Sequence, residues 1–362
     1  MRVLLIISAL RGGGAEKAMI NIASGLARRG HEVHLSLLGN QIEHEVPSNV
    51  KLHALLKPGE RFHTGWLGER ASARKLARLY QALGGHSTFD LVVSTLPFTD
   101  AVVRSAGIHD AHYRIANTLS AEVESLRKRS WIKAFRRGAR YRQLYAGQKL
   151  IAVSNGVAED LRDKLRVRFN DLVTIYNPFD FDAIRREAAL DDPDIPRSEY
   201  ILHAGSFLTA KRHDLLLDAF AKAKLPHTLV LLTQAAPRLS EMIAARGLQS
   251  RVMVAGFRNN PYPWFARASA VVLCSDREGM PNVLIEALIC GAPAVSTDCP
   301  SGPREILTGE MRRFLVPCGD ANALAARMKE VVEMRPAIDP AALRPFDKDS
   351  SLDAYEALAR RR

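Results

Sequence analysis

Short apolar runs alternate with amphipathic stretches along most of the chain. An apolar run bounded by turn residues predicts a buried strand, and apolar residues at helical spacing predict a helix that packs on it. The expected strands span residues 3–9, 32–38, 91–94, 114–116, 150–153, 173–176, 200–204, 228–232, 252–255, 270–274 and 294–297. Helices are expected over residues 15–29 and 213–223 and from about residue 282. Strands that alternate with helices predict parallel sheets with right-handed crossovers, which is an α/β fold.

The length of 362 residues predicts two domains, because a single hydrophobic core stops growing below this size. The Pro- and Asp-rich stretch LDDPDIPRSEY, residues 190–200, interrupts the alternation and is typical of a linker. We therefore predict an N-terminal Rossmann-like domain over residues 1–190 and a C-terminal one over residues 191–340. A helical tail is expected over residues 341–362, with packing back on the first domain as one option.

The most informative stretch is CSDREGMPNVLIEALICGAPAVSTD, residues 274–298. Glu278 falls in a loop after a buried strand, and Glu286 falls in the first turns of a helix that Pro281 is suited to open. Both carboxylates and the helix N–H groups are expected at the carboxyl edge of the sheet, where open α/β sheets bind ligands. Carboxylates suit sugar or ribose hydroxyls and helix N–H groups suit phosphate, so the pattern predicts a sugar-nucleotide site.

Two further loops are candidates for diphosphate binding. The loop RGGGAEK follows the first strand, and its glycines let the backbone approach an anion at a helix N-terminus. A dinucleotide fingerprint fails here, because Lys17 occupies the place of the third glycine and no acidic residue ends the second strand. A tight turn without a ligand remains an alternative. The loop GSFLTAKRH brings Lys211 and Arg212 to the crevice, where they could neutralise a diphosphate leaving group.

The charge is uneven along the chain. Residues 1–150 hold 23 Lys and Arg against 11 Asp and Glu, so they carry the whole formal net charge of +12. Such an excess predicts a partner that is an anionic membrane surface, an acidic acceptor or nucleic acid, unless it is an ordinary solvated surface.

The segment RKRSWIKAFRRGARYR, residues 127–142, concentrates eight of the basic residues. Trp131 and Phe135 are four residues apart in it and share one face of a predicted helix. Basic residues around an aromatic face suit the headgroup region of an anionic bilayer. We weigh a membrane surface and a solvated face about equally, and expect no nucleic-acid partner. No stretch is long enough to span a bilayer. The four cysteines form no CxxC pair, which indicates reduced cysteines in a cytosolic protein.

Several motifs occur together in an order that resembles one enzyme family. They are GGAEK, AVSNGVAEDL, IYNPFD, the G-x5-K loop, GFRNNPYPWFARA, EGMPNVLIEAL, GAPAVSTDCPSGPREIL and LVPCGD. The chain resembles GT-B glycosyltransferases of the retaining family 4 type, also called glycosyl transferases group 1, over nearly its whole length. It is similar in this respect to lipopolysaccharide-core and polysaccharide glycosyltransferases.

The resemblance implies two Rossmann-like domains that face a central cleft, with the acceptor side in the first domain and the nucleotide-sugar donor in the second. It implies retaining transfer without a metal or other cofactor, in which the donor β-phosphate oxygen takes the acceptor proton. The implied catalytic residues are Glu278 and Lys211. The implied donor-binding residues are Gly13, Gly14, Lys211, Arg212, Arg258, Met280, Pro281, Asn282, Val283 and Glu286.

The chain departs from the family pattern in places. Ser206 stands where many relatives carry a phosphate-binding arginine, so Arg212 or another basic group must compensate. Asn117 or Thr118 stands near the place of a histidine that many relatives have in the first domain. Asp180 and Asp182 form a D-x-D pair, which is the metal signature of the other main glycosyltransferase architecture. Its position after Asn-Pro favours a turn or helix cap instead.

The expected donor is a nucleotide sugar, most simply one linked to UDP, and the expected acceptor is a lipid-linked or phosphorylated glycan. Lipopolysaccharide core or cell-surface polysaccharide biosynthesis is the preferred setting, and a polyprenyl-diphosphate oligosaccharide is the alternative acceptor. We expect a cytoplasmic protein, peripheral on the inner face of the cytoplasmic membrane. Two rival hypotheses lie outside this class: a nucleotide-cofactor oxidoreductase and a basic RNA-binding protein.

Overall fold

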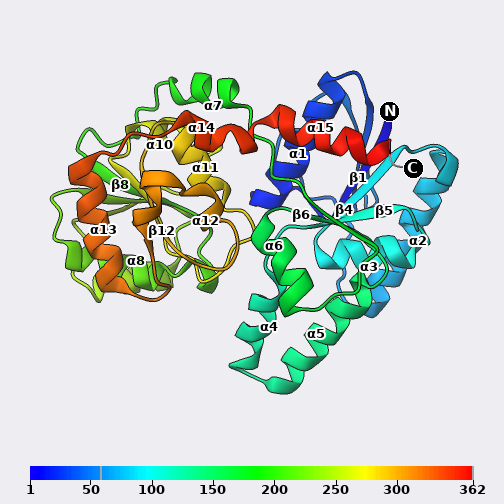
Figure 1. Cartoon of the computed structure of the whole chain (residues 1–362), viewed down its shortest axis with the longest axis horizontal. Coiled ribbons are helices and arrows are strands. Elements are labelled where there is room, and N and C mark those ends of the chain that lie inside the picture. Colours follow the sequence, from blue (N-terminus) through cyan, green and yellow to red (C-terminus); the bar gives the residue numbers. More distant parts are fainter. Residues whose placement is uncertain (58, 361–362) are drawn as a thin grey trace. The chain divides into compact units, whose positions relative to one another are not determined.

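The computed structural model describes residues 1–57 and 59–360, so the last two residues of the predicted tail lie outside it. The chain folds into two compact units, each an α/β domain with one parallel sheet (Figure 1). The first unit contains Met1–Pro178 and the chain from Lys348 onward, and the second contains Phe179–Asp347. The predicted fold class is confirmed.

The first unit is built on a seven-stranded sheet in the order β3-β2-β1-β4-β5-β6-β7, with every pair parallel. Its strands are β1 (Arg2–Ile7), β2 (Glu32–Leu37), β3 (Val50–Ala54), β4 (Leu91–Thr95), β5 (Ala111–Ile115), β6 (Lys149–Ala152) and β7 (Asp171–Thr174). Its helices are α1 (Gly14–Arg28), α2 (Trp66–Ala82), α3 (Pro97–Ser105), α4 (Leu119–Arg127), α5 (Trp131–Tyr145), α6 (Asn155–Glu159) and α15 (Lys348–Ala359). The central strands are buried on both faces, which explains their continuous apolar runs.

The second unit is built on a six-stranded parallel sheet in the order β10-β9-β8-β11-β12-β13. Its strands are β8 (Tyr200–Ala204), β9 (Thr228–Leu232), β10 (Val252–Val254), β11 (Ala270–Leu273), β12 (Ala294–Thr297) and β13 (Leu315–Val316). Its helices are α7 (Phe181–Ala188), α8 (His213–Ala223), α9 (Pro237–Ala244), α10 (Tyr262–Arg267), α11 (Asn282–Ile289), α12 (Pro303–Ile306), α13 (Ala321–Met334) and α14 (Pro340–Leu343).

The C-terminal helix α15 completes the core of the first unit, although it follows the second unit in sequence. Leu352 and Tyr355 are buried in the same core as α1. The helices approach closely because α1 has a glycine at the contact: a Cβ on Gly25 would lie 2.6 Å from Leu352. Arg29 at the end of α1 forms ion pairs with Asp349, Asp353 and Glu356 of α15. Helix α15 of the predicted tail therefore packs on the first unit, whereas residues 341–347 of that tail belong to the second unit.

The predicted linker at residues 190–200 is an anchored surface segment of the second unit. Asp192 accepts a hydrogen bond from the Trp264 indole at 2.7 Å, and Asp191 pairs with Arg267 of the same helix, α10. The chain instead enters the second unit between Pro178 and Phe179. The boundary therefore differs from the one predicted after residue 190, because the polar, Pro-rich composition reflects a surface loop rather than a connection between domains.

Each sheet has a topological switch point. The chain leaves β8 toward β9 and β10 on one side and returns to place β11 on the other side. In the first unit, β1 likewise lies between β2 and β4. Ligands of open α/β sheets bind outside the carboxyl ends of the strands at such points. Of the helices in the described part of the chain, none combines the length and apolarity that a membrane span requires.

Candidate active site

The loops that follow β8 and β11 meet at the switch point of the second unit. The β8 loop runs through Gly205 to Lys211 and leads into α8, and the β11 loop runs from Cys274 to Pro281 and leads into α11. Lys211 Nζ lies 2.6 Å from Glu278 Oε1. The two residues that the sequence singled out as catalytic are therefore brought together, although 67 positions separate them.

Glu278 is held from two sides. Besides the Lys211 ammonium, the buried Ser275 hydroxyl donates to Glu278 Oε1 at 2.5 Å. Thr297, at the end of β12, donates to the Ser275 carbonyl at 2.6 Å and fixes that backbone. Ser275 and Thr297 were missed by the sequence reasoning, although a polar residue at or just after the carboxyl end of a buried strand is the signal that could have identified both.

Lys211 is positioned by its backbone as well as by its charge. The thiol of Cys274, at the end of β11, donates to the Lys211 carbonyl at 3.1 Å. Burial raises the pKa of the Cys274 thiol, so the sulfur keeps the proton that it donates. All four cysteines are free thiols. Cys274 therefore holds the lysine loop against the sheet.

Arg212 points its guanidinium at carboxylates of its own unit. It makes a forked contact with Asp214, at 2.8–3.1 Å, and a further bond to Asp276 at 2.9 Å. The hydrogen bond to Asp214 raises the pKa of Arg212 above its usual range, so the group stays charged. Its backbone is left-handed, with φ of 49°. This geometry favours Arg212 as a residue that positions the loop, and a direct contact with phosphate would require its release from both carboxylates.

Two buried histidines flank the loop that carries Lys211, one in the strand before it and one in the helix after it. His203 of β8 and His213 of α8 pack edge to face, with ring centroids 4.8 Å apart. Burial lowers the pKa of His203 to about 3 and that of His213 to about 4. Both imidazoles are therefore neutral at physiological pH, and the positive charge of this loop comes from Lys211 and Arg212.

Glu286 is buried in α11, one turn from the helix N-terminus. The helix begins at Asn282 with Pro281 as its N-cap, so Met280–Val283 form the N-terminal region that was predicted to meet phosphate. Helix N–H groups and the positive end of the macrodipole suit an anion at this position. The structure thus places the predicted phosphate-binding backbone next to the Glu278 loop, within the same segment.

Gly302 supports this loop and was not identified from the sequence. It has φ of +95°, and a Cβ at this position would lie 2.4 Å from Pro281 Cδ and 3.2 Å from the Gly279 carbonyl oxygen. The loop after β12 therefore packs directly against the backbone that leads into α11. A side chain at residue 302 must displace Gly279–Pro281.

We expect Gly302→Ala to raise the KM for the donor by roughly tenfold, because the displaced backbone no longer presents its N–H groups correctly. Gly319→Ala is the matched control, since Gly319 also has positive φ, +80°, but its Cβ would meet nothing within 4 Å. Both substitutions add backbone strain of about 1 kcal/mol, and only the first adds the clash. Steady-state kinetics of the two variants test this expectation. Equal KM values would show that the contact does not shape the site.

The family resemblance, which implies a donor-binding role for Arg258, also implies that the backbone around this residue, in the loop after β10, pairs with the nucleotide base. Arg258 Nη1 bonds Asp194 at 2.6 Å, and its guanidinium lies over the Trp264 ring. Its Nε donates to the Ala255 carbonyl at 3.1 Å. The Arg258 side chain therefore fixes the loop. The backbone N–H and C=O groups around Arg258 are the groups of this loop that can pair with a nucleotide base. This assignment stays a prediction.

The glycine loop of the first unit follows β1, at the carboxyl edge and switch point of that sheet. Gly13 is the N-cap of α1, and Gly14 is the first residue of that helix. The Glu16 side chain folds back over Gly13. A Cβ at residue 13 would lie only 2.2 Å from Glu16 Oε2, so this position has no room for a side chain unless Glu16 moves. In the same unit, Thr118 is buried as the N-cap of α4. The sequence therefore places these residues at helix N-termini, and their contacts with substrate stay predictions.

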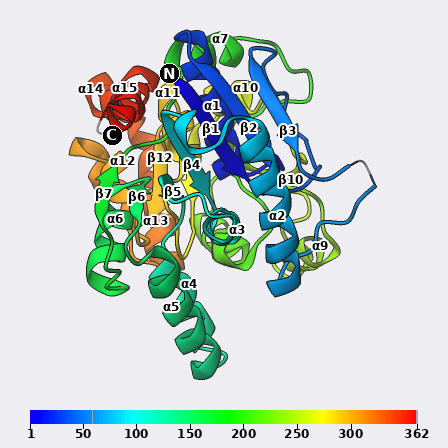
Figure 2. The same ribbon diagram turned by 90° about the vertical axis from the view of Figure 1, so that its right-hand side faces the viewer.

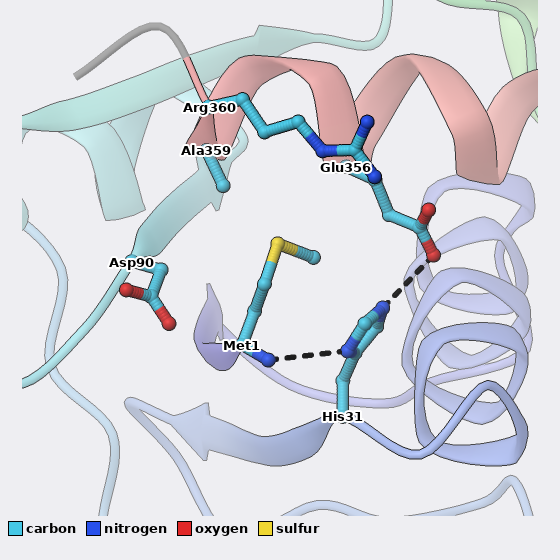
Figure 3. A pocket seen from close by; sticks show the side chains of 6 residues that line it. All are labelled: Met1, His31, Asp90, Glu356, Ala359 and Arg360. Atoms are coloured by element: carbon cyan, nitrogen blue, oxygen red, sulfur yellow. Dashed lines mark hydrogen bonds and ion pairs between the residues drawn. The ribbon is translucent and has the colours of Figure 1, made fainter.

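The pocket drawn in Figure 3 lies at the opposite edge of this sheet. Met1, His31 and Asp90 directly precede β1, β2 and β4, so they occupy the amino edge. The Met1 amino group lies 3.3 Å from His31 Nδ1, and His31 Nε2 lies 2.8 Å from Glu356 of α15. The pocket is thus separate from the glycine loop, and its contacts anchor the C-terminal helix.

The D-x-D pair is accounted for by local structure. Asp180 is the N-cap of α7 and accepts a hydrogen bond from the Ala183 N–H at 3.1 Å. This agrees with the interpretation as a helix cap. Across residues 1–57 and 59–360, no group of three or more His, Cys, Asp or Glu side chains is arranged to hold a metal ion.

Comparison with known proteins agrees with this architecture. A family model described as glycosyltransferase family 4 matches residues 12–183, and one described as glycosyl transferases group 1 matches residues 198–334. The N-acetylgalactosamine-N,N'-diacetylbacillosaminyl-diphospho-undecaprenol 4-alpha-N-acetylgalactosaminyltransferase of Campylobacter jejuni is 28% identical, over 91% of this chain and 89% of the relative. The lipopolysaccharide 1,6-galactosyltransferase of Escherichia coli is 26% identical, over 47% of this chain and 48% of the relative.

Solved structures agree on the fold. HepE of Anabaena, in complex with UDP and glucose, superposes with a TM-score of 0.74 at 18% identity and full coverage of both chains. The apo lipopolysaccharide outer core galactosyltransferase WaaB superposes with a TM-score of 0.66 at 17% identity, covering 99% of each chain. The protein is therefore a glycosyltransferase with the GT-B fold. Within that class, the chain belongs to the family 4 glycosyltransferases, and its second half is a group 1 domain.

Proposed function

We propose that the enzyme transfers a sugar, with retention of anomeric configuration, from a UDP-linked donor to a lipid-linked glycan. The observation that carries this proposal is the contact between Lys211 and Glu278 at the switch point of the second sheet. It places one cation and one carboxylate beside the N-terminus of α11, so groups for a diphosphate and for sugar hydroxyls converge.

In this proposal, Lys211 and the Met280–Val283 backbone hold the donor diphosphate, and Arg212 fixes the lysine loop. Glu278 leaves its contact with Lys211 and accepts hydrogen bonds from the donor sugar, and Glu286 accepts from the ribose. The backbone around Arg258 pairs with the base. Gly13 and Gly14 allow the first unit to approach the donor diphosphate and the acceptor.

The transfer step needs a group that removes the acceptor proton and a group that stabilises the leaving diphosphate. The bond between the anomeric carbon and the β-phosphate oxygen of the donor breaks, the acceptor oxygen bonds to that carbon on the same face, and a β-phosphate oxygen takes the proton of the acceptor hydroxyl. The Lys211 charge and the helix dipole of α11 stabilise the diphosphate that forms, so the reaction requires no metal ion.

Two acceptors have support. A lipopolysaccharide core or cell-surface polysaccharide acceptor fits the similarity to the galactosyltransferase of Escherichia coli, which extends over about half of each chain. A polyprenyl-diphosphate oligosaccharide fits the similarity to the Campylobacter jejuni enzyme, whose name gives a diphospho-undecaprenol saccharide as its acceptor and which matches over most of both chains. In either case the acceptor carries a lipid, and the enzyme works on the inner face of the cytoplasmic membrane, against an anionic surface.

A screen of donor hydrolysis across nucleotide sugars, with and without EDTA, tests the donor and the metal requirement. We expect turnover with a UDP sugar that EDTA leaves unchanged, and an α-linked product from an α-linked donor. Adding lipopolysaccharide core and polyprenyl-diphosphate oligosaccharide separately distinguishes the two acceptors. Failure to hydrolyse or bind any nucleotide sugar would contradict the proposal. Activity that is lost in EDTA and restored by manganese would overturn the metal-free mechanism.

A further inference from the structure

Helices α4 and α5 form a hairpin that extends away from the sheet of the first unit in both views (Figures 1 and 2). The inner face of α5 packs through Ala134, Gly138 and Tyr141, which are buried. Its outer face begins with three large apolar side chains, each more than half exposed: Trp131, Ile132 and Phe135. Ordinary packing of an amphipathic helix does not explain these residues, because they are large and apolar and yet remain exposed.

The basic residues of this hairpin divide into two groups. Arg137 contacts Glu122 of α4, and Arg140 pairs with Glu69 of α2 at 3.3 Å. These two arginines therefore help to hold α5 in place, and Arg127 pairs with its neighbour Glu124. The other basic residues are exposed and form no ion pair within the described residues: Lys128, Arg129, Lys133, Arg136 and Arg142.

The pair between Arg140 and Glu69 also brings the first turn of α2 next to α5. That turn exposes Trp66 and Leu67. The Arg70 guanidinium stacks on the Trp66 ring, 3.9 Å from its centroid. Two adjoining helices thus present large apolar side chains together with unpaired cations on one unit.

We propose that this surface, formed by the outer face of α5 and the first turn of α2, docks the enzyme on anionic lipid. Trp131, Ile132 and Phe135 enter the headgroup boundary, and the unpaired cations of α5 contact lipid phosphates. Interfacial helices bind in this way, by buried apolar area together with attraction to anionic headgroups. The inference deepens the proposed function and rests on it for the lipid anchor of the acceptor.

Two features favour a lipid surface over other occupants. Ile132 and Leu67 are aliphatic, so they offer no ring on which a nucleic-acid base could stack. A second copy of the chain would bring the same exposed cations together, and like charges repel. The positive charge that residues 1–150 carry suits an anionic bilayer instead.

Vesicle flotation with the whole enzyme tests the surface directly. We expect flotation with vesicles that contain phosphatidylglycerol and none with phosphatidylcholine alone. Replacing Lys128, Lys133 and Arg136 together with glutamine should lower the partition coefficient by on the order of 100-fold, at a factor of about five for each cation removed. The matched control replaces Lys222, Lys224 and Arg238 with glutamine, because these cations are equally exposed but belong to the second unit. It should float like the parent.

Tryptophan fluorescence tests the apolar part. The chain has three tryptophans, and Trp264 is buried, so a blue shift on anionic vesicles reports Trp66 and Trp131. The shift should persist in Trp66→Phe at reduced amplitude and vanish when Trp131→Phe is added. Phe135→Ala should weaken flotation at least threefold.

The results separate this inference from the proposed function, because flotation requires neither donor nor acceptor. The glutamine triple variant should hydrolyse donor like the parent. If it also floats like the parent, or if the control triple variant loses flotation equally, the docking surface is overturned while the enzyme assignment stands. Preferential binding of single-stranded RNA, or salt-insensitive self-association through Trp131, would overturn it as well. Flotation without any nucleotide-sugar turnover would refute the proposed function alone.

Discussion

Replacing Lys211 with alanine is expected to lower the turnover number by on the order of 100-fold or more. The ammonium group lies 2.6 Å from Glu278 Oε1 at the switch point, next to the N-terminus of α11. Charge develops on the leaving diphosphate in the transition state, and a preorganised cation stabilises it more than it stabilises the bound donor. The loss should therefore appear mainly in kcat. The neutral histidines below the loop cannot replace the missing charge.

The measurement is steady-state donor hydrolysis together with calorimetric binding of UDP and of uridine. UDP affinity should fall, and uridine affinity should not change, because uridine carries no phosphate. Lys222→Ala is the matched control, since it removes the same group from an exposed position on α8. Turnover of Lys211→Ala within threefold of the parent, with the fold intact by circular dichroism, would remove Lys211 from the catalytic assignment.

The strands of the buried sheets could be predicted because they are uninterrupted apolar runs between turns. The strands β8, β9 and β12 and the helix α8 occur at the predicted residues. The strand β3 (Val50–Ala54) was missed because it is an edge strand, and only Val50 of its residues is buried. The two-residue β13 carries too little pattern to be recognised. Edge strands lose the apolar signal because solvent covers part of their surface.

The candidate site was partly predictable for a similar reason. Lys211 and Glu278 could be assigned to the same sheet edge, because both follow strands of one parallel sheet. Their direct contact depends on β8 and β11 being neighbours, which is set by strand order rather than by sequence spacing. The partners of Arg212 were not predictable either. Asp214 lies in the first turn of α8, two residues from Arg212, whereas Asp276 lies in the loop after β11, and only the folded structure brings Asp276 to the same guanidinium.

Glu286→Gln is expected to weaken UDP binding by roughly 1–3 kcal/mol, because a charge-assisted hydrogen bond to ribose becomes neutral or is lost. Glu286 is buried one turn into α11, on the helix whose N-terminus faces the Lys211 loop region. The loss of affinity should depend on the ribose hydroxyls. Binding of UDP and of 2′-deoxy-UDP by the parent and the variant tests this. The mutation should cost less binding free energy with 2′-deoxy-UDP, because the hydroxyl that Glu286 binds is already absent.

Calorimetric titration of the four protein–nucleotide combinations provides this comparison, with Glu333→Gln, an exposed glutamate on α13, as the control substitution. Equal losses for both nucleotides would mean that Glu286 acts by holding α11 in place rather than by binding ribose. Unchanged UDP affinity in a folded variant would exclude both roles. A loss confined to UDP would place the ribose beside α11, and the diphosphate would then lie within reach of Lys211, because both groups belong to one nucleotide and one sheet edge.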